Sequence, residues 1–583
     1  MAFSKTKGLP TASSETSQKL IVAALDFGTT FSGWAYSFCS EKDRVFCKSW
    51  NSGNYLTQKT PTTVLIQPDG KTLEAFGYDA ENRYSDLFDK QKHTKYYYFQ
   101  RFKMLLYDNK TLTRNEDLND THGKRLKAKT VFSLAIQFLK DDLLEYLNKS
   151  ITSPPSVSDI QWVLTVPAIW SIRAKQFMRE CAEQAGIKTN YLKIALEPEA
   201  ASLHCKQLEI NRKEDTRSPS SFKPGSQYMV VDAGGGTVDI VIHKVRRDGT
   251  LEEISPANGG KWGGTCIDRA FMDLLYDIYG QDVVQKLKSE NVDDYLELLR
   301  EIESKKKTVS PTKTTQLKLR VPLKLNQIYE AENNKRVNDK LIPKLDGRVL
   351  LKDDKLLFDD ELIKHIFEKT TGKIVGHLKQ FLSKETRTII MVGGFSESQM
   401  LFNVIQDAFK DYKVISPPEA ELSVLKGAVL YGHKCDDISI RVSPYTYGCK
   451  AVCDYDPAKD ERRRMYLDDD GNPQVDGVFM KLIQINERIP VNNETRSRTA
   501  RPSGNNTTFD LKLFASSDPD PTYVDESSCF PVGSVNVDCR DDDGDVGSAK
   551  VSLKFGGTEV EARAVLKSNG RLTTTTFNFL DKM

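Results

Sequence analysis

The 583-residue chain has no long hydrophobic run and no strong excess of charge of either sign. None of its apolar runs approaches the roughly 20 residues that a membrane-spanning helix needs, so we expect no membrane span. Its 83 Lys and Arg residues almost balance its 81 Asp and Glu residues, for a formal charge of +2. The basic excess typical of nucleic-acid-binding proteins is therefore lacking. Residues 1–19 are polar and lack the apolar core of a signal peptide, so we expect a disordered N-terminal tail.

Cysteine and histidine form no recognisable metal or catalytic pattern. The ten cysteines are scattered without a CxxC pair, and the seven histidines are dispersed, so none is assigned to catalysis. Cys449 and Cys453 could join a metal site, but no second pair at the usual spacing accompanies them. Scattered reduced thiols are typical of reducing compartments, so we expect a cytoplasmic protein with structural thiols.

The most informative stretch that is present spans residues 228–244 and reads YMVVDAGGGTVDIVIHK. Two β-branched runs flank a glycine turn, which predicts a strand, a tight turn and a second strand. Consecutive glycines let backbone N–H groups point into one concavity that binds an anion, and Asp232 and Thr237 suit a metal-bound phosphate. The stretch lacks the Gly-Lys-Ser/Thr ending of a P-loop, and a strand follows where a dinucleotide motif needs a helix. An ordinary glycine-rich hairpin is the alternative, and the stretch alone leaves both open.

A second stretch, residues 20–38 (LIVAALDFGTTFSGWAYSF), repeats this pattern of strand, acid, Gly/Thr turn and strand. Two copies of one phosphate-binding hairpin suggest an internally duplicated fold. A carboxylate from each copy, Asp26 and Asp232, could face one Mg²⁺ through water molecules. For Asp26 alone, the alternative is an Asx-turn residue.

Between and after these hairpins the pattern alternates helices and strands. A third strand, in RTIIMVGGFSESQM, ends at Gly393 and Gly394 and leads into a helix, whose N-terminus can bind a polyanion. Residues 192–202 predict a strand that enters a turn at Glu197-Pro198, and 317–357 a small sheet. Helices are expected at 96–106, 129–147, 171–185, 293–307, 359–382, 399–409 and 421–432, with another beginning at Asp268.

From about Asp436 the helical periodicity stops and short alternating segments separated by turn clusters follow. This pattern is typical of a separate β-sandwich-like domain. The residues alone therefore predict an α/β part followed by a β-rich part. Lys103 lies on a predicted helix, where a lysine is usually a solvated surface residue. Glu197 ends a predicted strand, where the alternative is a charge at the start of a helix.

Taken in order, ALDFGTT, TVPAIW, LEPEAA, VVDAGGGTVDI, MVGGFSES and KGAVLYG resemble the actin-like ATPase fold of the heat-shock 70 kDa protein family. The resemblance is strongest to the divergent subgroup known as heat shock 70 kDa protein 12. It covers about residues 20–434 motif by motif and the remainder more loosely. It implies an α/β fold of two lobes with a duplicated core around a deep nucleotide cleft. Lobe I would span 20–227, lobe II 228–435, and a β-sandwich-like substrate- or partner-binding domain without a helical lid 436–583.

The resemblance also implies ATP or ADP with Mg²⁺ as ligands, and it assigns the site residues. Asp26, Glu197 and Asp232 would surround hydrated Mg²⁺ and the attacking water. Lys103 matches the family's catalytic lysine, and Thr237 joins it, Glu197 and Asp232 as a catalytic residue. Nucleotide-binding residues would be Gly28, Thr29, Thr30, Gly234, Gly235 and Gly236 at the phosphates, Glu303, Lys306, Lys307 and Ser310 at adenosine, Gly393 and Gly394 on the opposite wall, and Gly263 and Gly264 in a glycine loop.

Two departures from the family pattern bear on function. The family has arginines at the positions of Lys307 and of the Phe395-Ser396-Glu397 run. Arginine stacks on aromatic rings as lysine does not, so the sequence leaves the preference for adenine open. The segment HKCDDISIRV lacks the family's apolar linker, so the usual co-chaperone contacts are not implied.

The expected function is slow ATP hydrolysis that controls a domain binding extended polypeptide or a dedicated protein partner. No arginine-finger candidate is evident, which is why slow hydrolysis is expected. The alternatives are a nucleotide-regulated scaffold with little hydrolysis and a small-molecule kinase of the same superfamily.

Overall fold

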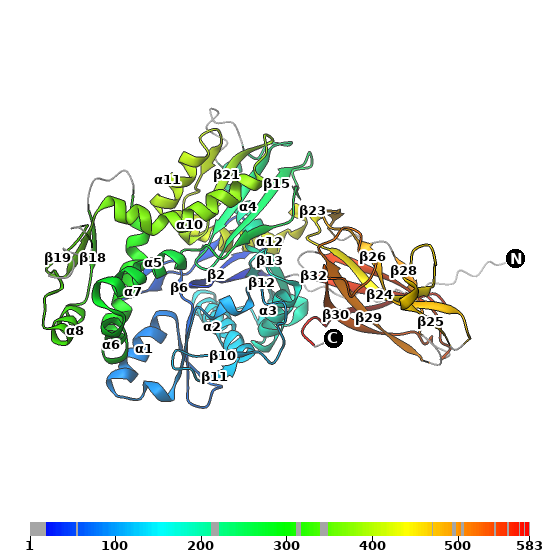
Figure 1. The fold of residues 1–583 in the computed structure, drawn as a ribbon, viewed down its shortest axis with the longest axis horizontal. Helices are drawn as coiled ribbons and strands as arrows, with labels where there is room; N and C mark the ends of the chain where they lie inside the picture. Colours follow the sequence, from blue (N-terminus) through cyan, green and yellow to red (C-terminus); the bar gives the residue numbers. More distant parts are fainter. Residues whose placement is uncertain are drawn as a thin grey trace.

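The computed structural model describes residues 19–53, 56–211, 221–310, 316–338, 345, 348–468, 470–491, 497–502, 506–541, 544–556, 559–570, 572–576 and 578–581. The predicted N-terminal tail, apart from Lys19, lies outside these residues. Figure 1 shows an α/β body and, at one end of the long axis, a β-rich region drawn in orange and red.

The first sheet is built on the first predicted hairpin. Its strand order is β13-β12-β1-β2-β3, and β6 also pairs with β2. The hairpin strands β1 and β2 are antiparallel, whereas β12 and β13 run parallel to β1. Every residue of β1 is buried, as in sheets covered on both faces. The strands are β1 (Ile21–Phe27), β2 (Phe31–Phe38), β3 (Phe46–Cys47), β6 (Thr60–Pro61), β12 (Ile160–Val166) and β13 (Leu192–Leu196).

The second sheet repeats that order around the second hairpin. It runs β22-β21-β14-β15-β16-β23-β27, with β17 also on β15. Again the hairpin is antiparallel, and the two strands beyond it are parallel. The strands are β14 (Gln227–Ala233), β15 (Val238–Val245), β16 (Leu251–Glu253), β17 (Asn258–Gly260), β21 (Thr386–Val392), β22 (Lys413–Ile415), β23 (Ile438–Val442) and β27 (Arg488–Pro490).

Two helices lie between the sheets and join them (Figure 1). α4 (Glu197–Asn211) contacts β14 and β15, and α12 (Ser423–His433) contacts β1 and β12. The two helices cross so closely that a Cβ on Gly427 would lie 1.7 Å from the Ala200 carbonyl oxygen. The small residues in KGAVLYG thus permit the crossing.

The remaining helices surround the sheets, and the small sheets lie at the periphery. α2 and α3 cover the first sheet, whereas α5, α7 and α10 share the core of the second. The helices are α1 (Gly77–Asp89), α2 (Ala128–Ser150), α3 (Ile172–Gln184), α5 (Thr265–Tyr279), α6 (Gln281–Glu290), α7 (Val292–Thr308), α8 (Leu323–Asn333), α10 (Asp360–Phe381) and α11 (Gln399–Ala408). The peripheral strands are β4 (Trp50–Asn51), β5 (Leu56–Thr57), β7 (Thr63–Ile66), β8 (Leu73–Phe76), β9 (Tyr97–Gln100), β10 (Asp117–Asn119), β11 (Arg125–Lys127), β18 (Leu317–Arg320), β19 (Val349–Lys352) and β20 (Lys355–Phe358).

The β-rich region consists of a five-stranded sheet, β25-β26-β24-β29-β30, and a four-stranded sheet, β28-β31-β32-β33. Leu513 from one sheet and Leu553 from the other are fully buried in one shared core, as in a sandwich. The strands are β24 (Thr446–Asp454), β25 (Met465–Leu467), β26 (Pro473–Ile483), β28 (Arg498–Ala500), β29 (Thr508–Ser516), β30 (Cys529–Asp538), β31 (Ala549–Gly556), β32 (Glu559–Leu566) and β33 (Leu572–Thr576).

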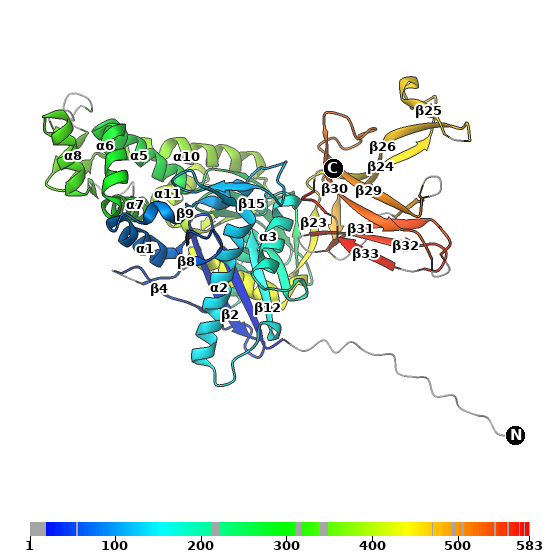
Figure 2. The ribbon, with the colours of Figure 1, turned by 90° about the horizontal axis from the view of Figure 1, so that it is seen from below.

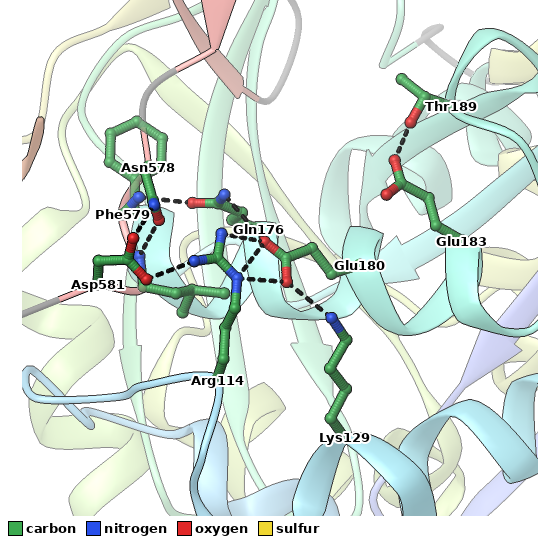
Figure 3. A network of polar contacts seen from close by, with 10 residues as sticks. Arg114, Lys129, Gln176, Glu180, Glu183, Thr189, Asn578, Phe579 and Asp581 are labelled. Carbon is green, nitrogen blue, oxygen red and sulfur yellow. Dashed lines mark hydrogen bonds and ion pairs between the residues drawn. The ribbon is translucent and has the colours of Figure 1, made fainter. Parts of the chain in front are cut away.

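The β-rich region contacts the α/β body at α3, which lies between them in Figure 2. Figure 3 shows the polar part of this contact. Arg114 pairs with Glu180 at 2.6 Å and with Asp581 at 2.5 Å, and the Phe579 backbone N–H donates to Gln176 Oε1 at 2.7 Å. Phe579 belongs to the β-region core, whereas the next residue, Leu580, belongs to the core of the first sheet.

Three predicted elements differ from the structure. The helix predicted at 96–106 is wrong, because β9 precedes a 3₁₀ helix, η2 (Phe102–Leu106). The turn predicted at Glu197-Pro198 is the first turn of α4, where proline at the second position is compatible with a helix. The predicted small sheet at 317–357 is present as β18, β19 and β20, but α8 interrupts it.

The residues that the structure describes include neither a membrane-spanning helix nor a disulfide bond. Across these ranges, no helix combines the length and apolar character required to cross a bilayer. All ten cysteines lie within the described ranges, and each is a free thiol.

Candidate nucleotide site

The glycine turns of the two hairpins face each other. A Cβ on Gly235 would lie 2.2 Å from Thr30 Oγ1, and one on Gly236 would lie 2.7 Å from Thr29 Oγ1. Only residues without side chains allow the turns to approach so closely. Within the described chain, the N–H groups of Gly28–Thr30 and of Gly235 and Gly236 donate no hydrogen bond. Two opposed turns therefore offer free amide donors to an anion between them.

The carboxylate at the end of the first strand is held in its charged form. Asp26 is buried and accepts hydrogen bonds from Lys59 Nζ at 2.6 Å and from Thr165 Oγ1 at 2.8 Å. Burial alone would raise the pKa of Asp26, but the Lys59 ammonium and these hydrogen bonds hold the pKa below its usual range. Asp26 is therefore a fixed negative charge beside the Gly28 turn.

The carboxylates of the second hairpin have the opposite electrostatic character. Asp232 and Asp239 are paired across β14 and β15, and both are buried. Burial and the nearby charges of Glu197, Asp239 and Asp26 raise the pKa of Asp232 well above its usual value. Burial also raises the pKa of Asp239, although its carboxylate accepts the Ile169 backbone N–H at 3.1 Å. This site therefore favours a proton or a cation.

Lys103 and Glu197 connect the two hairpins. Lys103 Nζ donates to Glu197 Oε1 at 2.8 Å and lies 5.0 Å from the centre of the Trp170 ring. Only 2% of Lys103 is exposed, which excludes the surface interpretation. Burial raises the pKa of Glu197 to about 7; Lys103 opposes this shift, and the charges of Asp26 and Asp239 add to it. Lys103 thus lies among four carboxyl groups, which belong to Asp26, Glu197, Asp232 and Asp239.

The glycine loop before α5 supports the second turn. The N–H groups of Gly263 and Gly264 donate to the carbonyls of Gly236 and Gly234 at 3.2 and 3.0 Å. These two amides are therefore engaged in holding the turn. Gly393 lies on the other side, where an added Cβ would be 2.3 Å from Asp232 Oδ1.

The residues predicted to contact adenosine form a second, adjacent group on α7. Lys306 is buried, donates to Asp268 at 2.7 Å and also pairs with Glu303. A Cβ on Gly264 would lie 3.1 Å from Lys306 Nζ, which places this group beside the glycine loop.

Lys307 lies between two carboxylates, at 3.3 Å from Glu397 and 3.2 Å from Glu421. Burial alone would lower the pKa of Lys307, but Glu421 and Glu397 raise it. The lysine therefore ties α7 to the loop segments η5 (Gly394–Glu397) and η6 (Ala420–Leu422). Ser310 is half-buried just beyond α7, and an added Cβ on Gly394 would meet open space.

Sequence reasoning did not assign three residues of this site. Lys59 and Thr165 hold Asp26, and neither has a motif that distinguishes it from a surface lysine or a strand threonine. Asp239 did carry a signal, since an acid within the β-branched run VDIVI must be buried with partners.

The carboxyl groups fit a hydrated divalent cation better than a directly bound one. Over the described ranges, no three His, Cys, Asp or Glu side chains are arranged to hold a metal ion directly. Yet burial and the surrounding carboxyl groups raise the pKa of Asp232, and a nearby cation would offset the excess negative charge there. Mg²⁺ retains several waters in phosphate sites, so contact through water is compatible with this geometry.

Comparison with known proteins finds similarity to one protein family. The family model described as Hsp70 protein matches residues 91–464. The chain is 30% identical to human heat shock 70 kDa protein 12A, over 97% of this chain and 93% of that protein. It is 29% identical to human heat shock 70 kDa protein 12B, over 96% and 91% of the two chains. Similarity to the chaperone protein DnaK of Endomicrobium trichonymphae is 24% identity over 57% of this chain and 48% of that one.

The first hairpin lies before the family-model match, but the alignments with the two human proteins extend across nearly the whole chain. The chain therefore belongs to the Hsp70 family, within the divergent subgroup that resembles heat shock 70 kDa protein 12.

Proposed function

We propose that this protein binds ATP with Mg²⁺ between the two hairpin turns and hydrolyses it slowly, as a cytoplasmic chaperone-like protein. The observation that carries the proposal is the pair of opposed turns with free amide groups beside Lys103 and four carboxyl groups. Family membership supports a nucleotide-binding, chaperone-like role. The repeated strand order supports two actin-like lobes, 20–227 and 228–435, around the nucleotide.

The proposed chemistry requires positioning and charge neutralisation more than covalent catalysis. The amides of Gly28–Thr30 and of Gly235 and Gly236 would hold the β- and γ-phosphates. Lys103 would stabilise negative charge that develops on the transferred phosphoryl group. Asp232 would orient the attacking water or accept its proton, for which a raised pKa is suited. Mg²⁺ held through water near Asp26, Asp232 and Glu197 would neutralise phosphate charge.

The β-rich region would be the output of this switch. We assign residues 436–583 as a domain that binds extended polypeptide or a dedicated protein partner, without a helical lid. The shared core of its two sheets supports an independent sandwich unit. Its contact with α3 supports transmission of nucleotide state from the α/β body, and closure of the two lobes on ATP would be the driving motion.

Single-turnover hydrolysis tests the proposal. Purified wild type, Asp232→Asn and the exposed control Asp86→Asn would each be mixed with substoichiometric ATP and Mg²⁺. Wild type and Asp86→Asn should release phosphate at the same slow rate, and Asp232→Asn should be at least tenfold slower, as expected for loss of a group acting in the transition state. If all three bind ATP and share one negligible rate, the alternative of a scaffold with little hydrolysis holds.

The nucleotide base needs a separate titration. Lys307 is held by Glu397 and Glu421, so it is not free to replace a stacking arginine. Calorimetric titration with ATP, ADP and GTP in the presence of Mg²⁺ should therefore show only a modest preference for adenine. A phosphate transfer to an added polyol would instead support the small-molecule kinase alternative.

A further inference from the structure

A cavity of about 430 Å³ lies where the α/β body meets the β-rich region. One wall comes from the start of α3 and the residues before it, another from β23 and the segment after it, and a third from β30 and β32. The aromatic rings of Trp170, Tyr445 and Phe530 line it. Its volume is in the range of pockets that bind small organic molecules. None of the residues assigned to nucleotide lines it, although Trp170 lies beside both this cavity and Lys103.

Three charged groups that line this cavity, those of Arg441, Glu559 and Glu253, have polar partners. Arg441 makes two hydrogen bonds to Glu199, at 2.9 and 2.6 Å, and Glu559 pairs with Arg179. Glu253 accepts the Val442 backbone N–H at 2.8 Å. Over the described part of the chain, the Lys175 ammonium has no hydrogen bond or ion pair, although it lines the cavity.

The charge balance favours an anion. Four of the lining side chains are basic (Lys110, Arg173, Lys175 and Arg441) and three are acidic (Asp108, Glu253 and Glu559). Arg173 donates only to the carbonyls of Leu112 and Pro531, both at 3.4 Å. Burial and the charge of Glu199 raise the pKa of Glu253 to about 8, so this carboxyl group is mostly neutral at pH 7. Burial and the neighbouring Arg441 lower the pKa of Lys175 to about 8, the direction expected for an ammonium without a counter-ion.

We propose that this cavity binds a small organic anion with a planar apolar body, whose anionic group pairs with Lys175 and whose body lies among Trp170, Tyr445 and Phe530. The ligand would contact both the α/β body and the β-rich region, so it would stabilise their contact. This inference does not depend on ATP hydrolysis.

The test uses a matched pair of probes, 1-naphthaleneacetate and the uncharged 1-naphthaleneethanol, titrated calorimetrically into the full chain. The acid should bind at one site, and the alcohol at least tenfold more weakly, because a charge-assisted hydrogen bond contributes about 1.5–3 kcal/mol. Lys175→Met should weaken the acid about tenfold or more and leave the alcohol unchanged. Lys149→Met, at an exposed lysine, is the control and should change neither.

Two further measurements locate the site. Ile172→Trp would fill the cavity and should prevent both probes from binding. The acid should also quench tryptophan fluorescence in wild type and quench it less in Trp170→Phe, a measurement that does not require the filled variant to fold. The proposal is wrong if neither probe binds, if both bind equally, or if Lys175→Met binds the acid as wild type does.

Discussion

At the scale of single residues, the candidate site combines two carboxylates of opposite electrostatic character. Asp26 is held ionised by Lys59, whereas Asp232 lies among other carboxyl groups that disfavour its ionisation. Raised pKa values concentrate at functional sites because burial and like charge are tolerated there for chemistry. Ionisation of Asp232 in the native, nucleotide-free protein therefore costs stability.

This cost of ionisation predicts that Asp232→Asn stabilises the nucleotide-free protein more at pH 8 than at pH 5. Between the ordinary pKa of aspartate and the raised native pKa, the native carboxyl keeps a proton that the unfolded chain has lost. Wild type therefore loses stability as pH rises through this window, by about 1.4 kcal/mol for each pKa unit of the shift. Asparagine does not titrate, so the stability of Asp232→Asn relative to wild type increases as the pH rises.

Thermal unfolding of Asp232→Asn and wild type at both pH values measures this difference. Asp86→Asn, at an exposed position, should show the same melting temperature relative to wild type at pH 5 and pH 8. A pH-independent effect of Asp232→Asn would contradict the electrostatic account.

At the scale of elements, the crossing of α4 and α12 positions the site. α4 begins with Glu197, which pairs with Lys103, and two residues later carries Glu199, which pairs with Arg441 of β23. One helical turn thus contacts the candidate nucleotide site and the strand that leads to the β-rich region. The crossing depends on glycine at position 427.

Gly427→Ala should therefore destabilise the protein by about 1–3 kcal/mol or more, since the new methyl group would overlap the Ala200 carbonyl. The matched control is Gly376→Ala in α10, where an added Cβ meets nothing within 4 Å. Alanine should stabilise that helix by up to about 1 kcal/mol. Equilibrium unfolding in urea measures both, and equal effects of the two substitutions would show that helix propensity, not the crossing, decides the outcome.

Elements with a clear hydrophobic periodicity or a glycine turn could be predicted from the sequence. The hairpins around Asp26 and the GGGT turn and the helices at 129–147 and 359–382 are present as β1–β2, β14–β15, α2 and α10. The 96–106 segment could not be predicted, because its aromatic residues suit either a helix or a strand and tertiary pairing with β7 decides. The role of Lys59 could not be predicted either, because only the folded chain brings Lys59 next to Asp26.

At the scale of the whole molecule, the last described residues fasten the β-rich region to α3 (Figure 3). Phe579 and Leu580 are both buried, one in each core, and Arg114 holds Asp581. The contact combines apolar burial with a charge network on one helix. A single substitution at this contact should therefore weaken the attachment of the β-rich region.

Leu580→Asp should release the β-rich region from α3, because an unpaired carboxylate would be placed in the core of the first sheet. Small-angle X-ray scattering should show a larger maximum dimension than for wild type, with melting of the α/β body changed less. Leu56→Asp, at a position that is 70% exposed, is the control and should leave the scattering curve unchanged. An unchanged curve for Leu580→Asp would mean that the other contacts suffice.

The sheet order has a practical consequence for dividing the chain. β23 and β27 lie beyond the proposed lobe boundary at 435, yet both are strands of the second sheet, and β23 pairs with β16. A chain cut before Ile438 would leave β16 as an unprotected edge strand, which invites aggregation. It would also leave the fully buried Glu199 without Arg441, a loss that costs about 3–5 kcal/mol for buried ion pairs. A fragment that ends at the proposed boundary of 435 should therefore be less stable and less soluble than the full chain.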